Sequence, residues 1–245
     1  MIPEDKLSEF VRRARETSDA NLEAILLFGS AVSGDFHPGL SDLNLFCVLR
    51  DSSFAALQTL APAVKRWIRQ KQPPPLCMTR EELARSSDVF TIELLDMVQH
   101  HRLLYGQDVL QGLDIPTHLH RIQVEYELRE KLVLLRQHLL VADGKRARLW
   151  DVLLHSAPSF ATLFRHALVV LGGNWPESRS AAIQTLAKQL QFDLSSVEEV
   201  LNVREHKIDP KTLNVQDLCA RYLAVIERIA GAVDGAVDEG APAPR

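Results

Sequence analysis

Residues 25–49, ILLFGSAVSGDFHPGLSDLNLFCVL, contain the pattern that decides the fold. Residues 25–28 are a short apolar run that predicts a buried strand, and Gly29-Ser30 ends that run. A polar loop with Gly and Pro follows, and a second apolar strand begins near Asp42. This layout leaves backbone N–H groups at the end of the first strand, where a helical turn begins, and such groups can bind phosphate.

Several polar side chains in this stretch are candidates for contact with a phosphate or a metal ion. Ser30 adds a hydroxyl donor to the turn. Asp42 and Asn44 are two residues apart on a strand, so their side chains share one face of the sheet. His37 lies in the loop between the two strands, where a phosphate contact and an ordinary loop position are equally good interpretations.

Gly29-Ser30, followed by Ser41-Asp42-Leu43-Asn44, resembles the signature of the nucleotidyltransferase fold, the DNA polymerase beta superfamily. The surrounding sequence is similar to small bacterial and aminoglycoside-type members. The resemblance implies that Gly29 and Ser30 bind a triphosphate, with Ser41 and His37 beside them. It also implies that Asp42 and position 44 hold Mg²⁺ or Mn²⁺ together with an NTP.

The second acid of that signature is replaced by Asn44 in this sequence. Magnesium prefers charged oxygen ligands, and a two-metal site uses ligand charge to hold two dications close together. Asn44 offers an amide oxygen without charge. We therefore expect one ion, bound by Asp42 and the phosphates, and not a complete two-metal site.

A third carboxylate is missing from residues 75–77, where the family pattern often has one. Residues 89–105 offer Glu93 and Asp96 as substitutes, and Glu93 is the candidate general base. This segment can be interpreted as a strand and turn or as a helix, so neither acid can be placed. Surface charge is the simpler explanation for both. His100 and His101 are predicted to be solvent-exposed turn residues.

Two functions remain open. The first is transfer of a nucleoside monophosphate from an NTP to a hydroxyl of a small molecule or protein, weakened or lost because Asn44 replaces an acid. The second is a non-catalytic protein of the same fold that binds a nucleotide, a ligand or a partner. The intact Gly29-Ser30 and Asp42 favour the first function, whereas Asn44 and the missing third acid favour the second.

Composition narrows the class of protein. The 245 residues are 46% hydrophobic and 24% charged, with a net charge of −4, which argues against a general nucleic-acid or anionic-membrane binder. No apolar run reaches transmembrane length, and the first residues lack the apolar core of a signal peptide. Three widely spaced cysteines predict buried free thiols and a cytoplasmic protein. A homodimer is left open.

The chain is expected to fold as two domains and a tail. Residues 1–112 predict an α/β nucleotidyltransferase-like domain with a small mixed sheet, in which Thr79 and Glu82 form a capping box. Residues 115–234 show helical periodicity with short turns, which predicts an all-α bundle of five helices. Residues 235–245 are small and polar, with proline, and predict a disordered tail.

Overall fold

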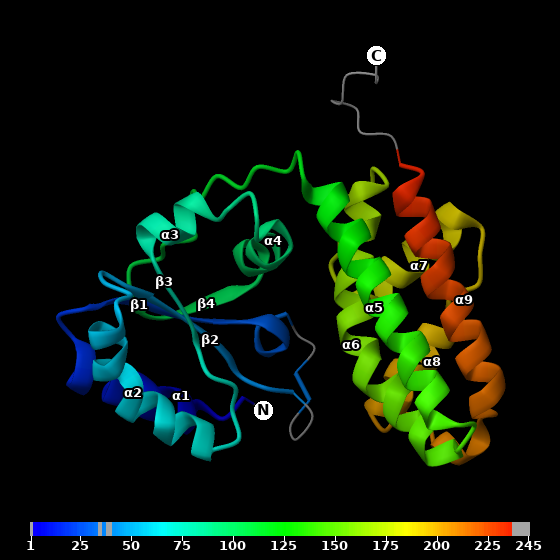
Figure 1. Cartoon of the computed structure of the whole chain (residues 1–245), viewed down its shortest axis with the longest axis horizontal. Helices are drawn as coiled ribbons and strands as arrows, with labels where there is room; N and C mark the ends of the chain where they lie inside the picture. Colours follow the sequence, from blue (N-terminus) through cyan, green and yellow to red (C-terminus); the bar gives the residue numbers. More distant parts are fainter. Residues whose placement is uncertain (1, 34–35, 38–40, 237–245) are drawn as a thin grey trace. The chain divides into compact units, whose positions relative to one another are not determined.

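The computed structural model describes residues 2–33, 36–37 and 41–236 (Figure 1). The chain divides into two compact units, Met1–Pro116 and Thr117–Arg245. Within the described ranges, no helix is both long enough and apolar enough to cross a membrane. The predicted tail at 235–245 falls mainly on residues 237–245, outside the described part of the chain.

The first unit is built on a four-stranded sheet in the order β3-β2-β1-β4. Its strands are β1 (Leu22–Phe28), β2 (Asn44–Leu49), β3 (Leu76–Thr79) and β4 (His101–Gly106). β1 pairs antiparallel with both β2 and β4, whereas β2 pairs parallel with β3. The sheet is therefore small and mixed, which confirms the predicted fold class of this unit.

Helices cover both faces of this sheet. Helices α1 (Glu4–Ser18) and α2 (Phe54–Arg69) pack on one face, where Phe10 and Trp67 join a core with Ile25 and Leu27 of β1. Helices α3 (Arg80–Arg85) and α4 (Thr91–Gln99) cover the other face. There they pack against Ala24, Leu26, Phe46 and Val48. Residues of β2 alternate between the two faces, as the pleat requires.

The two interpretations of residues 89–105 are both partly correct. The segment forms α4 and then β4, with a single residue, His100, between them. Thr79 caps α3, and the predicted capping box with Glu82 is present. Both hydrogen bonds of this box join residues that are close in sequence, so the local sequence pattern was enough to predict them.

The cysteines are free thiols, as predicted, but two of them lie opposite each other. Cys47 of β2 is paired in register with Cys77 of β3. Their hydrogen bond, together with complete burial, raises the pKa of the Cys47 thiol, and the same bond lowers the pKa of the half-buried Cys77. Separation in sequence hid this pair because the parallel β2–β3 pairing is not local.

The second unit is all-α, as predicted. Five helices make it up over the described residues: α5 (His120–Ala142), α6 (Arg146–Val170), α7 (Arg179–Leu190), α8 (Ser195–Arg204) and α9 (Val215–Asp234). The short 3-10 helix η2 (Pro210–Thr212) precedes α9. The long helix α6 is the most buried, and it packs against each of the other four.

Candidate functional site

The site forms where β1 ends and β2 begins. Phe28 is paired with Asn44, so the turn that follows β1 lies beside the first residue of β2. Gly29 opens the short 3-10 helix η1 (Gly29–Ala31) with φ +76°, a conformation that glycine adopts without strain. A Cβ at this position would lie 2.9 Å from Asn44 Nδ2, so the turn is closely packed against that amide.

The turn is tight and its backbone is well ordered by hydrogen bonds. The N–H groups of Val32 and Ser33 both donate to the Gly29 carbonyl, at 3.0 and 3.2 Å. The first N–H groups of such a turn have no acceptor within it, because the helical pattern starts further along the chain. Ser30 lies in this first part of the turn and is half-buried. The turn can therefore offer N–H and hydroxyl donors to an anion.

The loop between the strands closes on itself at His37 and Ser41. The Ser41 N–H donates to the His37 carbonyl at 2.9 Å, and the Ser41 hydroxyl accepts from the His37 N–H at 3.1 Å. Ser41 thus has a structural role in this loop, next to its predicted role in nucleotide binding. Residues 34–35 and 38–40 of the same loop lie outside the described part of the chain.

Asp42 is held at the entrance of β2 by its neighbour. Leu43 is buried, and its N–H donates to Gln72 Oε1 at 2.8 Å, which ties the segment to the loop between α2 and β3. Asp42 itself is exposed. Strand alternation places Asn44 on the same sheet face as Phe46, the face that α4 covers. The contact of Gln72 was not predicted from the sequence, since nothing in the local pattern around this residue indicates it.

The donor set fits one magnesium ion. Asp42 supplies a carboxylate and Asn44 an amide oxygen from neighbouring positions. Over the described ranges, no group of three or more His, Cys, Asp or Glu side chains is arranged to hold a metal. Magnesium commonly binds to one or two protein carboxylates and completes its shell with phosphates and water. The residues present therefore fit a single ion bound with a nucleotide, and not two ions held by protein alone.

The candidate base Glu93 lies in the first turn of α4 and is exposed. α4 covers the sheet face to which Asn44 belongs, but no contact of Glu93 with the other candidate residues is present among the described residues. Asp96 lies one helical turn nearer to β4. Of the predicted site residues, Gly29 and Asn44 are thus closely packed, and Ser30 follows Gly29 in the same turn.

His101 is not the exposed turn residue that the sequence suggested. It begins β4, pairs with Phe28, and its side chain is only 16% exposed. Nδ1 lies 2.8 Å from the Met97 carbonyl, and Nε2 lies 2.8 Å from Asp108 Oδ2. Both partner oxygens can accept a hydrogen bond, so the ring is held in place at both of its nitrogens. Burial alone would raise the pKa of Asp108, but the hydrogen bonds from His101 and from the backbone outweigh it and lower that pKa.

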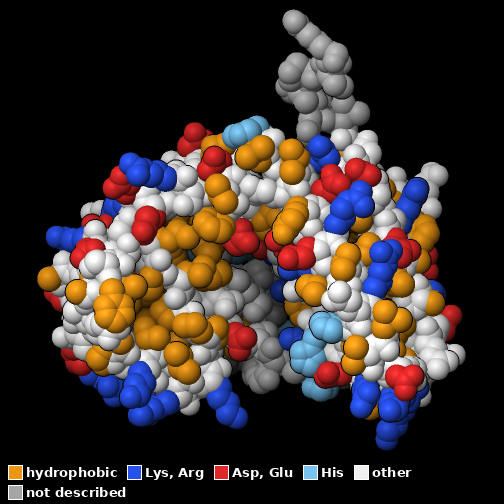
Figure 2. Space-filling view, viewed as in Figure 1, with side chains coloured by type: hydrophobic (Ala, Val, Ile, Leu, Met, Phe, Trp, Pro, Cys, Tyr) orange, Lys and Arg blue, Asp and Glu red, His pale blue; other side chains and the backbone are white. Residues whose placement is uncertain are grey.

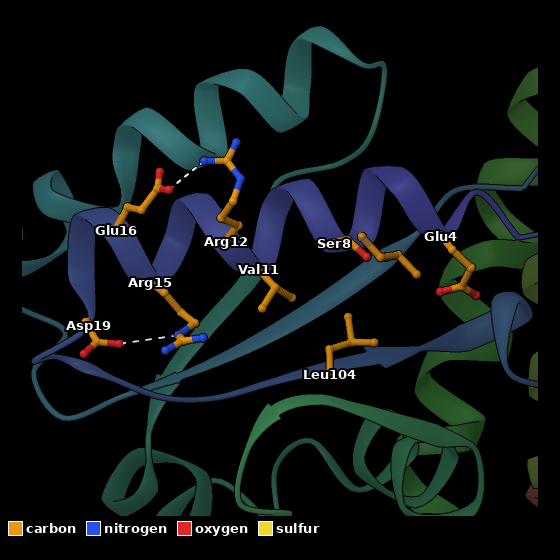
Figure 3. Close-up of a pocket in the computed structure, with 9 residues that line it drawn as sticks. Glu4, Ser8, Val11, Arg12, Arg15, Glu16, Asp19 and Leu104 are labelled. Carbon is orange, nitrogen blue, oxygen red and sulfur yellow. Dashed lines mark hydrogen bonds and ion pairs between the residues drawn. The ribbon is translucent and has the colours of Figure 1, made fainter.

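Two surface cavities lie elsewhere. One, of about 580 Å³, runs beside α1 along the open edge of β4, with Leu104 on its floor (Figure 3). Four of its charged residues pair with one another, Arg12 with Glu16 and Arg15 with Asp19, and Glu4 pairs with Arg102 of β4. The other, of about 780 Å³, lies between α5 and α6 of the helical unit. Neither cavity is lined by Ser30, Asp42 or Asn44.

Comparisons with known proteins agree with this geometry. Residues 5–96 match the family model described as "Nucleotidyltransferase domain". Among solved structures, spectinomycin adenyltransferase AAD(9) from Enterococcus faecialis, solved with ATP and spectinomycin, matches with a TM-score of 0.56 and 18% sequence identity. The match covers 92% of this chain and 98% of that chain. No curated protein sequence matches this chain.

Proposed function

We propose, on the basis that this chain has the nucleotidyltransferase fold, that it transfers a nucleoside monophosphate from an NTP to a hydroxyl group of a small molecule or protein. The observation that carries the proposal is the close packing of the Gly29-Ser30 turn against the strand start that bears Asp42 and Asn44. The solved relative was crystallised with ATP and spectinomycin, which supports a nucleotide and a small-molecule acceptor.

Each residue has a stated part in this reaction. The N–H groups of the turn and the Ser30 hydroxyl bind the phosphates, with Ser41 and His37 supporting the loop. Asp42 holds Mg²⁺ or Mn²⁺ with the help of Asn44, and the bound ion supplies charge neutralisation at the phosphates. The acceptor oxygen forms a bond to the α-phosphorus, the bond to the β-phosphate oxygen breaks, and pyrophosphate leaves. Glu93 is the proposed acceptor of the hydroxyl proton.

We assign the transfer reaction to a domain formed by residues 1–112. Residues 115–234 form the proposed helical domain. We further infer a cytoplasmic location, which the free thiols of Cys47, Cys77 and Cys219 support.

Binding without catalysis is the second candidate function. It is favoured by the amide at position 44 and by the apolar Leu76 and Cys77 on β3, where the family pattern has an acid. Such a protein would keep the phosphate turn and bind a nucleotide without transferring it.

Calorimetric titration distinguishes these functions. ATP, GTP, CTP and UTP are titrated with and without Mg²⁺ into the wild type, into Asp42→Ala, and into Asp5→Ala, an exposed control on α1. Metal-dependent binding that Asp42→Ala loses and Asp5→Ala keeps supports the metal site, and pyrophosphate release then tests for transfer. Binding without pyrophosphate release supports the non-catalytic protein. If none of the four nucleotides binds, both nucleotidyl transfer and non-catalytic nucleotide binding are rejected.

A further inference from the structure

Helix α2 has an apolar stripe on its surface in addition to the one it buries. Leu60, Ala63 and Trp67 face the core. Phe54, Leu57 and Ile68 are 78%, 36% and 48% exposed. Spacings of three and eleven residues put these last three side chains on one flank of a helix. A charged or polar flank is expected on a solvent-facing helix, so this stripe requires an explanation.

The stripe lies on the flank of α2 that faces away from α1. Contacts with α1 come from the opposite flank: Thr59 hydrogen-bonds to Ser18 at 2.9 Å, and Arg66 pairs with Glu9 at 3.1 Å. Gln70 also donates to Glu9, at 2.7 Å. Since α1 fills one side of α2, the apolar stripe is turned toward the other side of the sheet, where β3 is the last strand.

The outer edge of β3 is open. β3 pairs only with β2 over the described residues, so its other side presents unpaired backbone groups. Leu76 on this strand is 44% exposed, and its register with Phe46 places it on the sheet face that α3 and α4 cover. Figure 2 shows hydrophobic side chains gathered over this part of the unit, with Lys and Arg side chains below them. An open strand edge beside an apolar helix flank is a surface that can pair with another strand and helix.

Opposite charges lie at the two ends of this surface. Lys65, Arg69 and Lys71 lie at the end where α2 finishes, and within the described ranges none of them pairs with a carboxylate. Asp51 and Glu82 lie at the other end, where α2 begins, and Ser52 donates to Glu82 at 2.8 Å. The only partners that the described residues give these two carboxylates are hydroxyl and backbone groups. The 16-residue helix separates the two ends by about 24 Å.

We propose that this surface binds a second copy of the chain about a two-fold axis. The two β3 strands pair antiparallel and extend the sheet to eight strands, and the apolar flanks of the two α2 helices pack together. A two-fold axis reverses the direction of the second copy, so the basic end of each surface meets the acidic end of the other. This self-complementarity is what selects a second copy over an unrelated partner. The proposal is independent of the proposed transferase function.

Sedimentation or light scattering of the full chain tests the dimer. We expect a mass of about 55 kDa, twice the 27.5 kDa of one chain, over roughly 1–100 μM. Leu57→Asp and Ile68→Asp should each shift the mass toward one chain, because each places a charge in the apolar flank. Leu103→Asp is the matched control: Leu103 is 40% exposed on β4, the opposite edge of the sheet, and its substitution should leave the dimer intact.

A second pair of variants tests the charges. Arg69→Glu and Lys71→Glu should weaken the dimer at low salt, and added salt should weaken the wild-type dimer. These exposed positions leave the core untouched, so circular dichroism should show unchanged folding. A wild type that stays monomeric up to about 100 μM overturns the proposal. So does a dimer that Leu57→Asp and Ile68→Asp leave intact, or one that only Leu103→Asp disrupts.

Discussion

Asn44 determines how much negative charge the protein offers at this site. A carboxylate of the same size would bring a second charged oxygen to the cation that Asp42 is proposed to hold. We expect Asn44→Asp to tighten Mg²⁺-dependent nucleotide binding by about tenfold, or about 1.4 kcal/mol. Titration of the best-bound nucleotide with and without Mg²⁺ measures this change. Equal tightening in the absence of metal would contradict the reason given, since repulsion of the phosphates should then weaken binding.

Gly29 is the residue that the turn can least replace. Gly29→Ala should lower the free energy of unfolding by about 1–3 kcal/mol, because φ is +76° and the new Cβ would contact Asn44 Nδ2. Gly112→Ala is the control, since Gly112 has the same φ of +76° and no atom within 4 Å of its added Cβ. Denaturation of both variants separates backbone strain from the contact. Equal losses would mean that the close packing on Asn44 contributes nothing.

At the scale of elements, α6 continues through Pro158 although proline has no N–H to give the helix. The carbonyl that loses its partner is that of Leu154, four residues earlier, and Arg204 Nη1 of α8 donates to it at 2.8 Å. In the protein with Pro158, we expect Arg204→Ala to lower the free energy of unfolding by about 1–3 kcal/mol. The cost should be smaller in a Pro158→Ala background, because that substitution restores a backbone N–H that can donate to the same carbonyl. A double-mutant cycle in urea measures the difference, and additive losses would contradict the link.

A buried histidine pair joins α5 to α6. His120 Nε2 lies 2.9 Å from His166 Nδ1, and both rings are almost fully buried. Burial, and then the charge of His166, lower the pKa of His120 from 6.5 to about 4. Arg165, packed over Trp175 beside His166, adds positive charge to this region.

Because the folded pKa of His120 lies below the unfolded one, protonation favours unfolding. The contribution of neutral His120 to the free energy of unfolding is complete above about pH 6.5. It is lost as pH falls toward 4, by up to about 3 kcal/mol. Urea denaturation between pH 4 and 7.5 should show this loss, and His120→Asn should reduce it. His138→Asn, an exposed control, should leave the slope unchanged. An unchanged slope in His120→Asn would contradict the assignment.

At the scale of the whole molecule, what could be predicted from sequence was local. The Gly29-Ser30 turn, the Thr79 cap and the helices of the second unit each depend on neighbours within a few residues. The hydrogen bond of Gln72 to Leu43 and the pairing of Cys47 with Cys77 join segments 29 and 30 residues apart. Such contacts follow from strand order and register, which single-sequence periodicity does not determine.

The same distinction between local and non-local signals applies to the residues of the candidate site. The spacing of Asp42 and Asn44 is a local signal, whereas the place of Glu93 depends on how α4 lies on the sheet. His101 was mistaken for an exposed residue because its partners, Met97 and Asp108, are recognisable only once β4 is in place.

Because Cys77 lies on the edge strand β3, where it pairs with Cys47 of β2, the reactivity of its thiol can be used to measure association of the wild-type protein. Cys47 and Cys219 are buried, whereas Cys77 is half-buried on the open edge strand with a lowered pKa. Alkylating reagents attack thiolates, so Cys77 should be modified first. If two copies meet at β3, the rate of that modification falls as protein concentration rises. The alkylation rate of Cys77 in the wild-type protein therefore shows whether β3 is the last strand of the sheet or pairs with a second copy.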